Sequence, residues 1–154
     1  MKFGLSIPVT IGKNWKNKLL EILPLIEEAG VSSLLVWDHY MLPEKYGIES
    51  NNTIDAWTLL SFIAANTTKI KIGTCVTPIP FRPPQQLAKI VSSVDNISDG
   101  RVILGVGAGW HKPEFDAYST WDESKVRYEK TVEGLEIMKK LWTGEIVNFS
   151  GKYY

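Results

Sequence analysis

The chain has 154 residues, of which 44% are apolar, enough for one folded domain with a sizeable core and too apolar for a disordered chain. Its 17 Lys and Arg balance 17 Asp and Glu, so no basic excess points to a nucleic-acid partner. No apolar run approaches the ~20 residues of a membrane span, and the first apolar run predicts a strand, not a signal peptide. The only cysteine, Cys75, agrees with a reducing compartment, so we expect a cytoplasmic protein without membrane contact.

Short apolar runs alternate with amphipathic segments of helical period along the whole chain. Strands are expected at residues 3–9, 31–39, 70–76 and 102–106, and helices at 14–29, 53–66, 85–97 and 125–142. Residues 40–52 are expected to be irregular, and residues 146–154 a short extended tail. Four strand–helix units in succession predict one α/β domain over residues 1–154, with parallel strands in the order 1-2-3-4.

Three alternating glycines, Gly105, Gly107 and Gly109, follow the fourth expected strand. Their spacing, followed by Trp110, does not match the GxGxxG fingerprint of dinucleotide-binding folds. Residues 112–114 are expected to separate the glycines from any helix, which also argues against that fold. Two roles stay open for the glycines: turning the chain, or letting a ring or phosphate approach the backbone closely.

Asp38 and His39 stand at the end of the second expected strand. Parallel α/β enzymes place their sites at the C-terminal ends of strands, so this pair is a candidate site. The alternative is a capping aspartate beside a surface histidine. No His and carboxylate cluster has metal-ligand spacing, so no metal site is expected. Cys75 has no adjacent base and is not expected to act as a nucleophile. Glu114 is expected to be a solvated loop carboxylate, and the alternative is that it binds a ligand hydroxyl.

Several segments, in chain order, resemble the luciferase-like monooxygenase superfamily, above all its flavin- or coenzyme F420-dependent oxidoreductases. The segments that carry the resemblance are Glu27-Glu-Ala-Gly30, Val36-Trp-Asp-His39, Asp55-Ala-Trp-Thr-Leu-Leu60, residues 70–78, Pro84-Gln-Gln-Leu-Ala88, residues 95–110 and Leu141-Trp-Thr-Gly-Glu145. Together they cover essentially the whole chain. The resemblance implies a TIM barrel, which takes ~250 residues when complete.

With 154 residues the chain then carries strands one to four only, a truncated (β/α)4 half barrel without the family's main phosphate-binding loops. We therefore expect an N-terminal fragment or split half of an oxidoreductase. The alternative is a non-catalytic half barrel, a structural or binding module. Such a half barrel would pair with a second copy as a homodimer, or with a complementary C-terminal half.

The resemblance also implies that Asp38 and His39 face the ring of F420 or FMN. His39 would donate or accept a proton while Asp38 orients it. With F420 the reaction would be hydride transfer with a small organic substrate, and with reduced FMN it would be monooxygenation. Deazaflavin-dependent relatives often have Glu where Trp110 stands, so the choice between the two cofactors stays open.

Two further stretches are expected at the cofactor by the same resemblance. The third strand would carry a bulge with a cis peptide at Cys75-Val76 against the ring, followed by Thr77. The loop after the fourth strand would bring Gly107, Ala108 and Gly109 near the cofactor.

Overall fold

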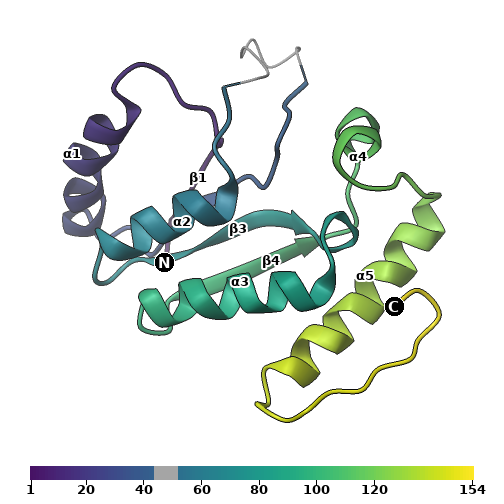
Figure 1. Cartoon of the computed structure of the whole chain (residues 1–154). Coiled ribbons are helices and arrows are strands. Elements are labelled where there is room, and N and C mark those ends of the chain that lie inside the picture. The colour runs from purple at the N-terminus through teal and green to yellow at the C-terminus, as the bar shows by residue number, and fades with distance from the viewer. Residues whose placement is uncertain (44–51) are drawn as a thin grey trace.

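The computed structural model describes residues 1–43 and 52–154 (Figure 1). The strands of the described residues are β1 (Gly4–Ile7), β2 (Ser33–Val36), β3 (Lys71–Pro78) and β4 (Val102–Gly107). They form one sheet in the order β1-β2-β3-β4, and every neighbouring pair is parallel. The predicted strand order and direction are confirmed, and the open sheet makes the fold a (β/α)4 half barrel. Of the stretch 40–52 expected to be irregular, residues 44–51 lie outside the described residues.

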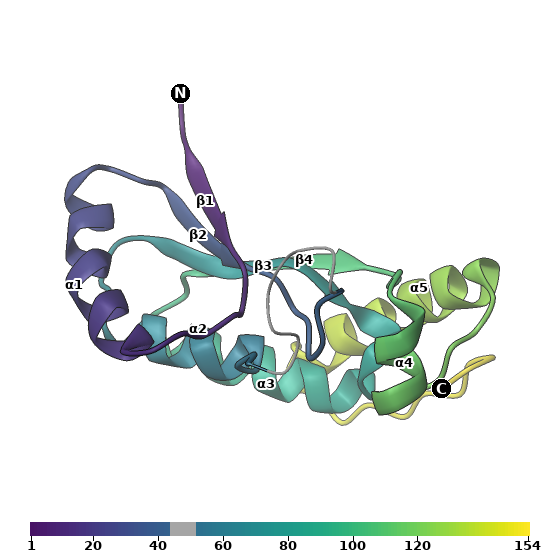
Figure 2. The ribbon, with the colours of Figure 1, turned by 90° about the horizontal axis from the view of Figure 1, so that it is seen from above.

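The helices gather on one side of this sheet (Figures 1 and 2). Their bounds are α1 (Trp15–Glu28), α2 (Ala56–Ala65), α3 (Pro84–Ile97), α4 (Lys112–Tyr118) and α5 (Ser124–Leu141), with a short 3-10 helix η2 (Ile79–Phe81) after β3. Leu34 and Val36 of β2 are fully buried and join the core formed with α2 and α3. Leu35, between them, is only half-buried, as the alternation of a strand covered on one face requires.

The third strand carries the predicted bulge. Register pairs Thr74 with Leu104 and Thr77 with Val106, so two residues of β3 oppose only Gly105 of β4. The two unpaired residues are Cys75 and Val76, and the peptide bond between them is cis, as predicted. The bulge turns Val76 outward, where 43% of it is exposed.

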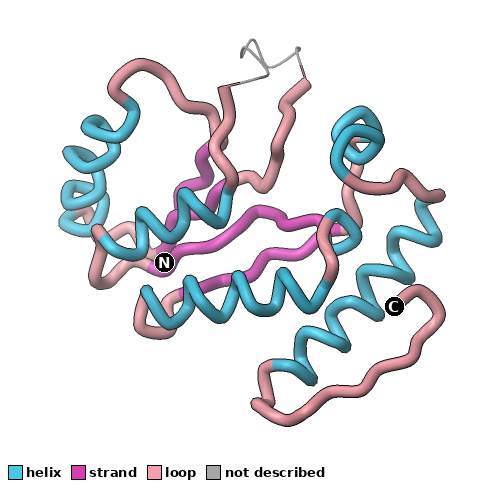
Figure 3. The backbone as a smooth tube through the Cα atoms, in the orientation of Figure 1, coloured by secondary structure: helices cyan, strands magenta, loops and turns pink. Residues whose placement is uncertain are grey.

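The α-helix α4 was not predicted. Residues 112–114 were expected to keep the chain non-helical after the glycines, but α4 begins at Lys112 (Figure 3). Pro113 lies in the first turn of α4, where the missing N–H has no helical partner to lose, and Glu114 follows it in the same turn. The Lys-Pro-Glu run is therefore a helix start and not an interruption.

The last residues, 146–154, fold back along α5 without forming a strand in the structure described (Figure 3). Glu133 of α5 accepts the backbone N–H groups of Lys152, Tyr153 and Tyr154. One carboxylate thus fixes the end of the tail. Within the residues that the structure places, no helix is both long and apolar enough for a membrane span.

Substitution of Gly73 tests the close contact of β3 with β4. A β-carbon at this position would lie 1.8 Å from the backbone oxygen of Ile103. We expect Gly73→Ala to lower the free energy of unfolding in urea by roughly 1–3 kcal/mol, because the two strands must separate. The matched control is Gly12→Ala, where nothing lies within 4 Å of the added carbon. Equal stability of the two variants would contradict the close contact.

Candidate functional site

A cleft of about 270 Å³ opens where β2, β3 and β4 end. Its lining residues come from the segments that follow β2, from the bulge of β3 and from the loop and helix after β4. They are Trp37, Asp38, His39, Leu42, Cys75, Val76, Pro78, Gly109, Trp110, Glu114 and Phe115. The cleft thus lies where parallel α/β folds place their sites, at the C-terminal ends of the strands.

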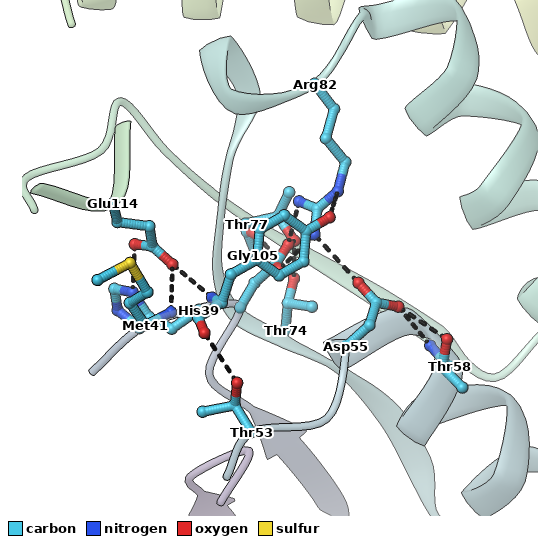
Figure 4. A network of polar contacts seen from close by, with 12 residues as sticks. His39, Met41, Thr53, Asp55, Thr58, Thr74, Thr77, Arg82, Gly105 and Glu114 are labelled. Atoms are coloured by element: carbon cyan, nitrogen blue, oxygen red, sulfur yellow. Dashed lines mark hydrogen bonds and ion pairs between the residues drawn. The ribbon is translucent and has the colours of Figure 1, made fainter. Parts of the chain in front are cut away.

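His39 binds a carboxylate that the sequence did not predict. Its Nδ1 atom lies 2.8 Å from Oε2 of Glu114, a residue of α4 (Figure 4). The side chain of His39 is 15% exposed and that of Glu114 is 2% exposed. The expectation of a solvated loop carboxylate at Glu114 is therefore wrong, because α4 turns this side chain into the cleft.

Glu114 also holds the backbone next to His39. Its Oε1 atom accepts the backbone N–H groups of Tyr40 and of Met41, the latter at 3.2 Å. One buried carboxylate thus contacts three consecutive residues of the segment after β2. Hydrogen bonds to a charged group are worth more than neutral ones, about 1.5–3 kcal/mol each, which fits a carboxylate kept away from water.

Asp38 does not contact His39 in the way that was expected. Its carboxylate binds the guanidinium of Arg82 through two contacts of 2.8 Å each, and the hydroxyl of Thr77 donates to it at 2.8 Å. Asp38 is 1% exposed and Arg82 is 9% exposed. A bidentate guanidinium–carboxylate pair fixes both planes, so Asp38 is committed to the scaffold behind the cleft.

Arg82 extends this network to two further elements (Figure 4). It donates to the hydroxyl of Tyr40 at 3.1 Å and lies 3.3 Å from Asp55, which caps α2 by accepting the N–H of Thr58. Burial alone would lower the pKa of Arg82, but the charge and hydrogen bonds of Asp38 outweigh it and raise that pKa. For the Tyr40 phenol, whose charged form is an anion, burial raises the pKa.

The glycines after and within β4 permit close packing around the bulge. A β-carbon on Gly107 would lie 2.7 Å from Val76, and one on Gly109 would lie 2.4 Å from the ring of Phe115. Gly109 also has a φ of +83°, in the region that favours glycine. Because Phe115 packs on this glycine, α4 folds back over the cleft and its neighbour Glu114 reaches His39.

The remaining predicted site residues divide into two groups. Cys75 and Val76 line the cleft with exposed side chains, and Gly109 lines it too. Thr77 is fully buried behind the cleft on Asp38, and Gly107 and Ala108 are not among the lining residues. The residues that the sequence did not predict are Arg82, Glu114 and the apolar walls Leu42, Pro78 and Phe115.

The residues present fit a flat conjugated ring. Val76 packs against Gly107 and is still 43% exposed in the cleft, and the walls are largely apolar or aromatic, with an imidazole beside them. No lysine or arginine of the described ranges lines this cleft, so it offers no cation to a phosphate. In the same ranges, no cluster of three His, Cys, Asp or Glu side chains could hold a metal ion.

A sequence profile of the luciferase-like monooxygenase family matches residues 1–154, so the chain belongs to this family. The F420-dependent glucose-6-phosphate dehydrogenase of Gordonia bronchialis is 34% identical over 141 residues, which are 90% of this chain and 41% of the relative. The enzyme of the same name from Nocardia farcinica is 35% identical over 141 residues, with the same coverage. The chain thus spans about 40% of the length of the curated relatives that it matches.

Solved structures share the fold along the entire chain. An F420-dependent secondary alcohol dehydrogenase in complex with an F420–acetone adduct superposes with a TM-score of 0.80 at 28% identity, covering 100% of this chain and 46% of that protein. The oxygenating constituent of 3,6-diketocamphane monooxygenase from Pseudomonas putida, in complex with FMN, superposes with a TM-score of 0.82 at 22% identity. The superposition covers 100% of this chain and 42% of the monooxygenase, and at 22% identity it supports the fold alone.

Removal of the charge of Asp38 tests the network behind the cleft. Asp38→Asn leaves Arg82 buried without its bidentate partner, and breaking such a buried pair costs roughly 3–5 kcal/mol. We expect that loss in the free energy of unfolding measured with urea. The matched control is Asp116→Asn, because Asp116 pairs with Lys112 while about half of each side chain is exposed, and exposed pairs contribute at most about 1 kcal/mol. A similar small loss in both variants would show that Asp38 does not carry the network.

Proposed function

We propose that this member of the luciferase-like monooxygenase family provides the ring-facing part of an F420-dependent oxidoreductase, which transfers a hydride between the deazaflavin and a small organic substrate. The observation that carries the proposal is the imidazole of His39, held by Glu114 at 2.8 Å in the cleft that Val76 and Trp110 also line. The F420-dependent names of relatives at 28–35% identity support the choice of cofactor.

The residues of the cleft would divide the work between binding and proton transfer. Val76, Pro78 and Leu42 would form an apolar surface for the ring, beside the exposed thiol of Cys75. When bound, the deazaflavin supplies the hydride acceptor or donor. His39 would give or take the proton that accompanies hydride transfer at the substrate oxygen, because its Nε2 atom is the ring nitrogen not engaged by Glu114.

Monooxygenation with reduced FMN is the second candidate. The FMN complex of the camphane monooxygenase superposes well but at an identity that supports only the fold. Trp110, 53% exposed, stands where deazaflavin-dependent relatives often have Glu, which is the feature of this chain that favours FMN. Turnover with F420 in the absence of oxygen would separate the two, because monooxygenation consumes oxygen.

A non-catalytic half barrel that pairs with another half is the candidate of a different class. The sheet leaves β1 and β4 as open edges, and such edges invite pairing. A stable homodimer of this chain that binds neither cofactor at any concentration would favour this candidate.

We expect the chain alone to bind F420 and FMN no more tightly than a dissociation constant of about 100 μM. The cleft supplies apolar walls but no lysine or arginine in the described part of the chain. Each missing charge-assisted contact with a phosphate forfeits about 1.5–3 kcal/mol, so two such losses weaken binding roughly a hundredfold or more. Isothermal titration calorimetry measures the constant directly. A low-micromolar value for the isolated monomer would contradict the expectation.

His39→Ala tests the proton-transfer role in a barrel completed by a complementary C-terminal half. We expect turnover to fall by roughly 10²–10⁴, the usual contribution of general acid–base catalysis, while cofactor binding stays intact. His111→Ala is the matched control, since it removes the other imidazole of the chain, which is not among the cleft-lining residues. Undiminished turnover of His39→Ala at unchanged cofactor affinity would disprove the role given to His39.

A further inference from the structure

Glu114 is a buried carboxylate whose recorded hydrogen bonds all go to one short segment. It is 1% exposed, and its acceptor contacts are the ring of His39 and the backbone N–H groups of Tyr40 and Met41. These residues lie more than 70 positions earlier in the chain. Burying a carboxylate is unfavourable unless hydrogen bonds compensate for the lost water. The bonds that compensate here come from the candidate proton-transfer group and from the backbone next to it.

We propose that Glu114 is the positioning residue of His39: it fixes the Nδ1–H tautomer of the neutral imidazole and so reserves Nε2 for the cleft. This proposal rests on the proposed function only where it assigns proton transfer to Nε2. The tautomer itself is a property of the chain without cofactor or substrate.

The tautomer follows from the acceptor character of the carboxylate. An ionised carboxylate accepts hydrogen bonds and donates none, so the contact of 2.8 Å requires a proton on Nδ1 of His39. A neutral imidazole carries only one N–H, which leaves Nε2 with a free lone pair. Hydrogen bonding at one ring nitrogen is the usual means by which proteins set the state of the other.

Other groups near the ring do not offer the same control. The oxygens of Asp38 accept from Arg82 and Thr77. The aromatic neighbours of His39 are Trp110 and His111, whose rings meet the imidazole edge-on at centroid distances of 5.7 and 6.4 Å, and neither is a carboxylate that can accept a proton from Nδ1. Glu114 is therefore the carboxylate that holds Nδ1 of this imidazole in the described structure.

Glu114→Gln hardly changes the size of the side chain, but we expect it to favour the opposite tautomer of His39. Oε1 of Glu114 receives two backbone N–H donors, so the amide of glutamine must turn its carbonyl oxygen toward Tyr40 and Met41. The amide nitrogen, which only donates, then faces Nδ1 of His39. Nδ1 must become the acceptor, and the ring proton moves to Nε2.

The experiment is two-dimensional ¹⁵N–¹H NMR of the imidazoles in the ¹⁵N-labelled, cofactor-free chain, at a pH where the rings are neutral. The chain has two histidines, and the signals that disappear in His39→Asn belong to His39. In the unsubstituted chain we expect a pyrrole-like shift at Nδ1 and a pyridine-like shift at Nε2. In Glu114→Gln we expect the two to exchange, so that the Nδ1–H form falls from the major to the minor population.

Glu27→Gln is the matched control. Glu27 likewise accepts backbone N–H groups, those of Thr68, Lys69 and Ile70, but it contacts neither histidine. Its replacement removes the same charge and should leave the tautomer of His39 unchanged. A change of similar size in the tautomer population of His39 in both variants would overturn the proposal. It would show that losing any carboxylate that binds loop backbone has this effect.

An Nε2–H tautomer in the unsubstituted chain would overturn the proposal without any variant, so the test survives a Glu114→Gln protein that does not fold. An unchanged tautomer in a folded Glu114→Gln would overturn it as well. If the tautomer exchanges but a completed barrel turns over at an undiminished rate, the positioning by Glu114 stands and the proton-transfer role of His39 falls.

Discussion

The buried ion pair of Asp38 and Arg82 is the contact on which the geometry of the cleft depends. Asp38 lies just after the end of β2. Arg82 lies just before α3, 44 positions later in the chain. Through the hydroxyl of Thr77 the same carboxylate reaches the residue that closes the bulge of β3, and through Asp55 the guanidinium reaches the N-terminus of α2. Two strand-to-helix connections, from β2 to α2 and from β3 to α3, are thereby tied to one charge pair. Loops that lack regular hydrogen bonding acquire a fixed geometry in this way. The consequence is that removing either partner of the buried pair destabilises the fold.

Asp38 and Glu114 divide two tasks that the sequence assigned to Asp38 alone. Asp38 and His39 are adjacent in the chain, and adjacent residues of an extended segment point to opposite sides. Asp38 therefore turns toward Arg82 behind the sheet end, and His39 turns toward the cleft. The carboxylate that meets the imidazole must come from another element facing the cleft. Glu114 meets this condition because α4 begins at Lys112, shortly after Gly109, and Phe115 packs back on that glycine.

The parts of the fold that were predictable are those encoded by local pattern. Apolar runs and helical period gave the four strands and their order, and the segment from Gly73 to Thr77 indicated the bulge through its resemblance to a family. Arg82 and Glu114 escaped prediction because their partners lie 44 and 75 positions away, and no spacing rule links them. A better interpretation of Pro113 was available from the sequence, since proline favours the first turn of a helix. It would have placed Glu114 on a helix, although not against His39.

The distribution of hydrogen bonds distinguishes the ionisable groups of the cleft. The oxygens of Asp38 accept from Arg82 and Thr77, and both oxygens of Glu114 accept from the segment after β2. Cys75 belongs to the bulge, and its exposed thiol lines the same cleft. His39 differs from these two carboxylates, because within the described residues its hydrogen bond is made through Nδ1 alone. In the proposed proton transfer, one nitrogen fixed by Glu114 and one facing the cleft would give direction and reactivity to a single side chain.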